Sequence, residues 1–143
     1  MDAHAIGRRQ TGNEVYIRSL VRRFPRLAPE IEFIGYTCCE QGDAWLPEEF
    51  ERRRVARNPF VRLGADLAAK ARADKADQQH VHYTAPLVQT VPVVVTIHDV
   101  SFIERPEYLS WSRAQQLRWT VRRTVAKAAK IITVSEFSRQ AIA

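Results

Sequence analysis

Four polar side chains follow two predicted strands, at the place where a parallel sheet exposes functional groups. His82 and Tyr83 end a short strand candidate, and His98 and Asp99 follow the β-branched run Val91–Ile97. In open parallel sheets, ligands bind beyond the carboxyl ends of the strands. An imidazole there can donate a hydrogen bond to a hydroxyl or carbonyl group, or act as a base near neutral pH. We therefore predict His98 and Asp99 as catalytic candidates. The alternative is a histidine bonded to a loop carbonyl, with Asp99 orienting the ring or capping a turn.

Two further pairs of residues have metal-binding side chains, but neither pattern is complete. His80 and His82 lie two apart and face one side of a strand, without a carboxylate or cysteine at ligand spacing. Cys38 and Cys39 are sequence neighbours, poorly placed to bridge each other, and form no CxxC pattern. We predict no metal site, two structural thiols, and a reducing compartment, the cytoplasm.

Two helix starts carry polar residues that could contact a ligand. Gly12 and Asn13 stand where backbone N–H groups can approach a phosphate closely, although a simple turn before a helix explains the glycine as well. Ser135 precedes the last predicted helix and is most simply its N-cap. The sequence has no nucleophile elbow, Walker loop or GxGxxG motif, which argues against nucleotide hydrolysis and dinucleotide binding.

Helices and strands alternate along the sequence. Capping boxes, Thr11 with Glu14 and Ser112 with Gln115, are expected to open two helices, and prolines 25 and 29 to end the first. Apolar spacing predicts helices over 11–24, 61–73, 112–129 and 136–143, strands over 31–37, 79–83, 91–97 and 130–134, and a loop over 42–59 with a short helix at 48–55. The alternation predicts an α/β fold with a Rossmann-like, doubly wound, mainly parallel sheet, and residues 1–143 as one domain.

The chain ends do not complete such a sheet. Only Met1–Ile6 precede the first helix, so Asp2 and Ala3 are interpreted as the tail of a truncated first strand. The last helix stops within two turns. We expect the chain to be a piece of a longer protein. Because strand edges would be exposed, a strand-swapped or edge-paired dimer is a further hypothesis.

Composition is that of a globular protein, with 45% hydrophobic and 27% charged residues among 143. The longest apolar run is far shorter than the roughly 20 residues of a membrane span, and no secretory signal is visible. Residues 111–130 hold six cations and no acid, which accounts for the formal charge of +6, because the other 16 basic residues equal the 16 acidic ones.

The basic segment 111–130 is expected to be an amphipathic helix. Its apolar stripe is Ala114, Leu117, Val121, Thr124, Val125 and Ala128, and Trp119 projects among cations on the other side. A solvated surface helix is the simplest interpretation. Docking to an anionic membrane surface, with Arg118, Trp119, Arg122 and Arg123 as interface candidates, and burial of Trp119 against another domain are the alternatives. Nucleic acid is not favoured as a partner, because aromatic and basic residues do not interleave.

Four segments in order, Thr11–Tyr16, His80–Pro86, Val93–Phe102 and Ile132–Ser138, resemble the N-terminal domain of a family 4 glycosyltransferase, the large retaining GT-B group. The resemblance covers nearly all of the chain. It implies two Rossmann-like domains, of which the N-terminal one mainly receives the acceptor and the C-terminal one binds the nucleotide-sugar. It also implies retention of anomeric configuration, with the nucleotide-sugar as co-substrate and no cofactor or metal required.

By position, the resemblance matches His98 to the cleft histidine that contacts the transferred sugar, with Asp99 as its neighbour. Gly12 and Asn13 match the glycine-containing loop near the donor diphosphate and acceptor. His82 and Tyr83 are expected to line the acceptor pocket, and Ser135 belongs to the last matching segment and is taken as a substrate-binding candidate.

The leading hypothesis is thus an acceptor-side domain that lacks its C-terminal donor domain, acts on a glycan or lipid-linked acceptor, and is inactive alone. We expect the protein to be cytoplasmic. Peripheral association with the inner face of the membrane is an alternative. One alternative is a non-catalytic membrane-surface or nucleic-acid binding module that uses helix 111–130. Another is half of a split enzyme that reassembles with a separately encoded donor domain.

Overall fold

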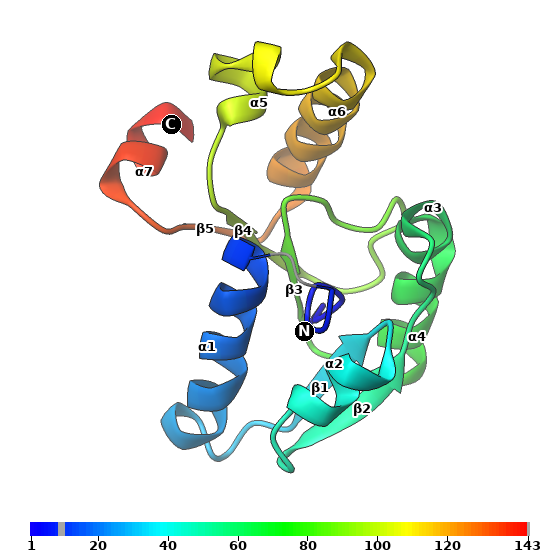
Figure 1. Cartoon of the computed structure of the whole chain (residues 1–143). Helices are drawn as coiled ribbons and strands as arrows, with labels where there is room; N and C mark the ends of the chain where they lie inside the picture. Colours follow the sequence, from blue (N-terminus) through cyan, green and yellow to red (C-terminus); the bar gives the residue numbers. More distant parts are fainter. Residues whose placement is uncertain (9–10, 143) are drawn as a thin grey trace. The chain divides into compact units, whose positions relative to one another are not determined.

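The computed structural model describes residues 1–8 and 11–142, which fold as two compact units, Met1–Leu67 and Ala68–Ala143. In both units, parallel strands alternate with helices, as Figure 1 shows by the colour sequence of the ribbon. The predicted α/β, Rossmann-like class is therefore confirmed. Each unit is described by itself below.

The first unit is built on a pair of parallel strands. Its elements are α1 (Thr11–Leu27), β1 (Phe33–Thr37), α2 (Glu40–Trp45), β2 (Phe50–Arg54), α3 (Pro59–Val61) and a π-helical turn (Arg62–Asp66). β1 pairs with β2 in parallel, and on its other side Asp2 forms a parallel bridge with Tyr36. Asp2 and Ala3 thus pair with β1 in the way that the end of a neighbouring parallel strand would.

An apolar core joins α1 to this sheet. Ile17 and Val21, one helical turn apart, are fully buried, and the Phe33 ring stacks on Phe24 and on Phe50 with centroids 5.7 Å and 5.1 Å apart. The helical spacing of the apolar residues in the sequence therefore identified the buried face of α1.

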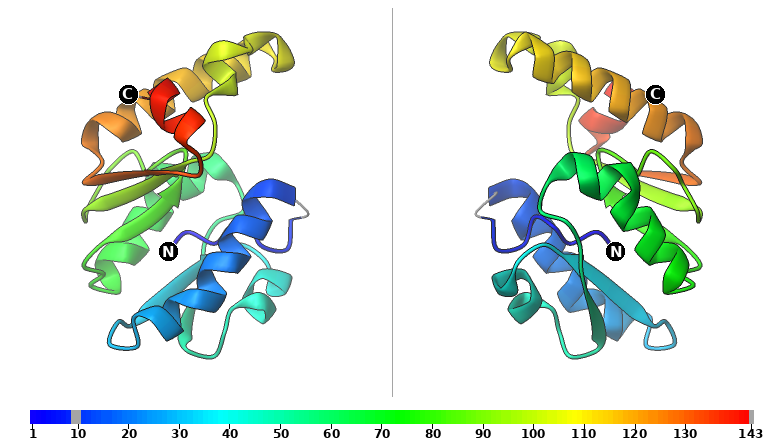
Figure 2. Two further views of the ribbon diagram at one scale, coloured as in Figure 1. Left: turned by 90° about the vertical axis from the view of Figure 1, so that its left-hand side faces the viewer. Right: turned by 90° about the vertical axis from the view of Figure 1, so that its right-hand side faces the viewer.

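The second unit is a three-stranded parallel sheet in the order β3-β4-β5. Its elements are α4 (Leu67–Ala73), β3 (Gln79–His82), β4 (Val93–Ile97), α5 (Ser101–Glu104), the 3-10 turn Pro106–Tyr108, α6 (Trp111–Lys127), β5 (Lys130–Thr133) and α7 (Glu136–Ile142). Figure 2 shows α6 along one face of this sheet and α4 on the other.

The packing of α6 matches its predicted amphipathic pattern. Ala114, Val121 and Thr124 are buried, and Val121 belongs to the core formed with β3 and β4. Trp119 is 60% exposed on the other side of the helix. The apolar stripe thus packs on the sheet, and the cations lie away from it.

Two predictions about helix and strand positions in the first unit are wrong. α1 continues through Pro25 to Leu27, since a proline near a helix end removes only one backbone bond, and the N–H of Ala28 still donates to the carbonyl of Phe24. The predicted loop over 42–59 contains most of α2, and the strand β2 stands in place of the short helix expected at 48–55. β2 was not predicted because its sequence is nearly all polar. Phe50 is the only buried residue of this strand.

Two finer expectations also differ from the structure, and a third falls on a side chain that the structure does not describe. α6 begins at Trp111, before the predicted cap Ser112. β5 was expected to be a buried strand, but as the edge strand it has no buried residue. The side chain of Thr11 lies outside the described residues. Its predicted partner Glu14 accepts a hydrogen bond from the N–H of Gly7.

Candidate active site

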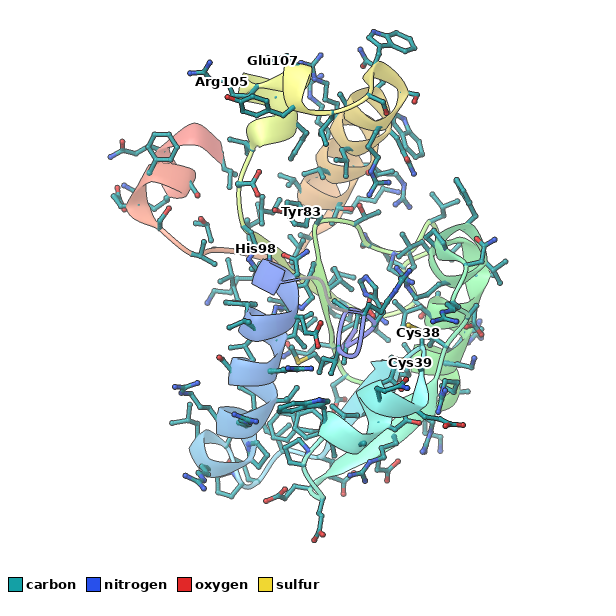
Figure 3. The ribbon with its side chains drawn as sticks, in the orientation of Figure 1. Cys38, Cys39, Tyr83, His98, Arg105 and Glu107 are labelled. Carbon is teal, nitrogen blue, oxygen red and sulfur yellow. The ribbon has the colours of Figure 1, made fainter. Side chains whose placement is uncertain are left out.

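Three aromatic rings meet at the carboxyl ends of β3 and β4. The ring centroids of His82 and His98 lie 5.6 Å apart, and those of Tyr83 and His98 lie 5.5 Å apart. Figure 3 labels Tyr83 and His98 at this place. His80, two residues before His82, lies with its ring centroid 5.1 Å from that of His82. The structure therefore brings together the residues that strand-end reasoning selected.

The parallel register of β3 and β4 explains this grouping. His82 is opposite Thr96, and the N–H of Tyr83 donates to the Thr96 carbonyl at 3.0 Å. Two residues after Thr96, His98 leaves the strand beside Tyr83. His82 is only 6% exposed, whereas Tyr83 and His98 are half-buried. Tyr83 and His98 are thus the rings of this cluster that a ligand can reach more readily.

Tyr83 is held by a short hydrogen bond and by an unusual backbone turn. Its hydroxyl donates to Asp99 Oδ2 at 2.5 Å. Its φ is 59°, and the N–H of Thr84 donates to the carbonyl of His82 at 2.7 Å, which closes a γ-turn. Non-glycine residues rarely adopt this conformation, which costs about 1–3 kcal/mol. Burial and the bond to Asp99 raise the pKa of Tyr83, so the phenol stays protonated at neutral pH.

His98 is a neutral imidazole at neutral pH. Burial lowers its pKa below the ordinary value, and the nearby Asp99 carboxylate offsets this only in part. A neutral imidazole donates through one ring nitrogen and accepts through the other. The ring can therefore bind a ligand hydroxyl or carbonyl without carrying a charge.

The start of α7 fixes the backbone of His98. Ser135 is the N-cap of this helix, because its Oγ accepts the N–H of Ser138 at 3.1 Å. The hydroxyl of Ser138 in turn donates to the carbonyl of His98 at 3.1 Å. The capping role predicted for Ser135 is confirmed, and its assignment as a substrate contact stays a prediction.

Two arginines of α6 support the loops around the site. Arg123 donates to the carbonyls of Pro86 and Leu87, which follow β3. Arg118 donates to the carbonyls of Phe102 and Ile103, which follow β4. Sequence reasoning treated these cations as surface charges, since charge patterning along one helix does not show which carbonyls lie next to it.

Gly12 and Asn13 lie in the first unit, in the first turn of α1. Gly12 is exposed, and among the residues that the structure describes, none has an atom within 4 Å of a Cβ atom placed on it. Their predicted contact with a ligand stays a prediction. Asp99 is exposed beside the rings of the second unit.

Gly7 is the glycine on which the backbone of the loop before α1 depends, a structural role that the sequence alone did not predict. Its φ is +81°, and a Cβ atom would lie 2.9 Å from Gln41 Cβ and 3.0 Å from Cys39 Sγ. Glu14 accepts its N–H at 3.0 Å and pairs with Arg18, which stacks on the Trp45 ring at 3.7 Å. In the sequence, the position of Gly7 shortly before the first predicted helix was the signal that could have indicated this structural role.

Both cysteines are buried and unbridged. The thiols of Cys38 and Cys39 donate to the carbonyls of His4 and Ile6, and burial raises the pKa of the Cys38 thiol. Among the described residues, no group of three or more His, Cys, Asp or Glu side chains is arranged to hold a metal ion. Within the same residues, no helix is long and apolar enough to cross a membrane.

Comparison with known families assigns the chain to a class of enzymes. The sequence profile of Glycosyltransferase Family 4 matches residues 11–143, and the chain therefore belongs to glycosyltransferase family 4. This family in general implies transfer from a nucleotide-sugar, with a sugar donor and an acceptor as substrates. No curated protein and no solved structure gives a significant match.

Proposed function

We propose that the chain is the acceptor-side domain of a retaining glycosyltransferase, which transfers a sugar from a nucleotide-sugar to a glycan or lipid-linked acceptor in the cytoplasm. The observation that carries this proposal is the cluster of His82, Tyr83 and His98 rings, with Asp99, at the strand ends of a family 4 chain. Sugars are bound by flat aromatic surfaces together with directional hydrogen bonds, and this cluster offers both.

In this proposal, His98 donates from its neutral ring to a hydroxyl group of the transferred sugar, and because its ring packs against those of His82 and Tyr83, it also borders the acceptor. Tyr83 and His82 line the acceptor side, and the bond from Tyr83 to Asp99 keeps the phenol ring in one orientation. Such fixed donors and surfaces act by positioning the reacting groups rather than by adding a charged base. The donor's nucleotide would be bound by a second domain, with Gly12 and Asn13 close to its diphosphate.

The first test is whether the 143-residue chain binds acceptors without turning over donors. Saturation-transfer NMR would use short oligosaccharides and a water-soluble polyprenyl diphosphate sugar as probes. We expect saturable binding that His98→Ala weakens and Phe60→Ala, a change at an aromatic side chain 75% exposed in the first unit, leaves unchanged. Binding that His98→Ala does not weaken would contradict the site assignment.

A turnover assay tests the assignment to the acceptor side. The chain is incubated with UDP-, GDP- and ADP-linked sugars and the same acceptors, and released nucleoside diphosphate is measured. We expect no release above that from buffer alone, because the proposal places donor activation on another domain. Sustained release of nucleoside diphosphate by the chain alone would overturn the assignment of donor activation to another domain.

The outer face of α6 supports a second candidate, docking to an anionic membrane surface. Trp111 and Trp119 are 79% and 60% exposed, and the exposed Arg122 follows Trp119 by one helical turn. Indole rings at the headgroup level and cations near anionic lipid are the usual means of peripheral binding. We expect sedimentation with phosphatidylglycerol vesicles but not with phosphatidylcholine vesicles. Equal sedimentation of the wild type and the Trp119→Ala/Arg122→Ala variant would rule this out.

A further inference from the structure

Ser138 lies at a junction between the helix α7 and the candidate active site. It is the third residue of α7 and only 5% exposed. Its hydroxyl makes two hydrogen bonds: it accepts from Ser135 Oγ at 3.0 Å and donates to the carbonyl oxygen of His98 at 3.1 Å. These three residues form a continuous chain of hydrogen bonds, which we name the serine relay.

We propose that Ser138 is a positioning residue for the active site, which acts by fixing the peptide group between His98 and Asp99. This inference rests on the proposed function of His98. It goes further because it assigns a role to the side chain of Ser138. Helix capping by Ser135 alone does not require that side chain.

The geometry of the peptide group carries the argument. The carbonyl oxygen of His98 and the N–H of Asp99 belong to one planar unit, so a hydrogen bond to the oxygen restrains the orientation of the whole peptide group. The orientation of that plane sets where the chain continues to Asp99. Asp99 must lie within reach of the Tyr83 hydroxyl, to which it is bonded at 2.5 Å. Through the His98 carbonyl, Ser138 therefore restrains the start of the loop that carries Asp99.

The relay also explains why a serine, rather than any N-capping partner, occupies position 138. The cap itself requires only the main-chain N–H of Ser138, which any residue except proline provides. The side-chain hydroxyl is needed for a different purpose, the bond to a residue 40 positions earlier in the chain. Without it, the carbonyl group of the half-buried His98, just after β4, would lose this hydrogen bond.

NMR of the 143-residue chain tests this role without any ligand. The variants are Ser138→Ala, which removes the hydroxyl, Ser138→Thr, which keeps it, and Ser112→Ala, a matched change at an exposed serine of α6. The readouts are the titration of the His98 imidazole and the resonance of the Tyr83 hydroxyl proton. The other groups that face His98 are His82, Tyr83 and Asp99, and they are unchanged in all variants.

We expect Ser138→Ala to raise the pKa of His98 toward its ordinary value, since a released loop exposes the ring to water. The Tyr83 hydroxyl proton should exchange with solvent at least about tenfold faster, as its bond to Asp99 loosens. Ser138→Thr should restore both values, and Ser112→Ala should match the wild type.

A lower melting temperature in Ser138→Ala, with unchanged His98 titration and unchanged Tyr83 exchange, would overturn the proposal, because it would show a purely structural role. These NMR measurements need no ligand, so their outcome can be told apart from that of the acceptor-binding test. Failure of His98→Ala to affect acceptor binding would remove the assigned site but not the positioning of His98 by Ser138.

Discussion

The hydroxyl of Tyr83 donates to the carboxylate of Asp99 at 2.5 Å, and this bond ties together the loops that follow two neighbouring strands. It connects the γ-turn after β3 with the chain that leaves β4 at His98. Because the two loops belong to parallel strands, the bond forms at the edge of the sheet where ligands bind. The candidate site is therefore a pair of mutually supporting loops rather than a set of separate side chains.

Tyr83→Phe should loosen this pair of loops while keeping the ring. The variant loses a hydrogen bond to a charged acceptor, and because Asp99 is exposed, we expect a loss of about 1 kcal/mol in the free energy of unfolding. Urea titration would measure this loss. Tyr108→Phe, at a tyrosine 74% exposed, is the matched control and should match the wild type. Equal stability of both variants would show that the Tyr83–Asp99 bond contributes nothing.

Stability should fall as the pH drops below about 6.5, in part because of His98. Burial lowers the pKa of His98 in the folded chain, so the unfolded chain binds a proton more readily. The stabilisation from this group is therefore present above the ordinary histidine pKa and is lost as the pH falls through the lowered value. Unfolding free energies between about pH 7 and pH 5 should decline less steeply in His98→Gln. An unchanged slope would show that His98 is not buried as described.

Gly7→Ala should destabilise the first unit, and Gly12→Ala should not. At Gly7, the positive φ and the contact of a Cβ atom with Gln41 Cβ at 2.9 Å make alanine costly, by about 1–3 kcal/mol. At Gly12, a Cβ atom meets nothing within 4 Å, and alanine in a helix is neutral or stabilising by up to about 1 kcal/mol. Thermal unfolding of the two variants would give the comparison. The reverse order would refute the assignment of Gly7 as the structural glycine.

Neighbouring arginines of α6 should behave differently on truncation. Arg123→Ala loses two bonds to the loop after β3, so hydrogen exchange at the Ala85 amide, which donates to Thr124 Oγ1, should accelerate by about tenfold. Arg122→Ala should change unfolding free energy by less than about 0.5 kcal/mol, since its side chain is exposed. Equal exchange rates in the two variants would mean that Arg123 does not hold the loop.

The sequence predicted the class of fold and the members of the ring cluster, because both follow from local patterns. Alternation of buried strands and helices defines the fold, and the strand-end rule selects His98 and Tyr83. The relay through Ser138 could not be predicted, since it joins residues 40 positions apart. β2 was missed for a related reason: an edge strand that buries only Phe50 lacks the apolar alternation that identifies strands.

The most direct test of the account is the His98 imidazole resonance of the 143-residue chain during titration with sugar-bearing ligands. Short oligosaccharides and a water-soluble polyprenyl diphosphate sugar are compared with UDP, GDP and ADP. We predict that at least one sugar-bearing ligand shifts the resonance in a saturable way and that the nucleoside diphosphates leave it in place. A His98 resonance that no sugar-bearing ligand moves, or that a nucleoside diphosphate moves equally, would contradict the assignment of His98 to sugar binding.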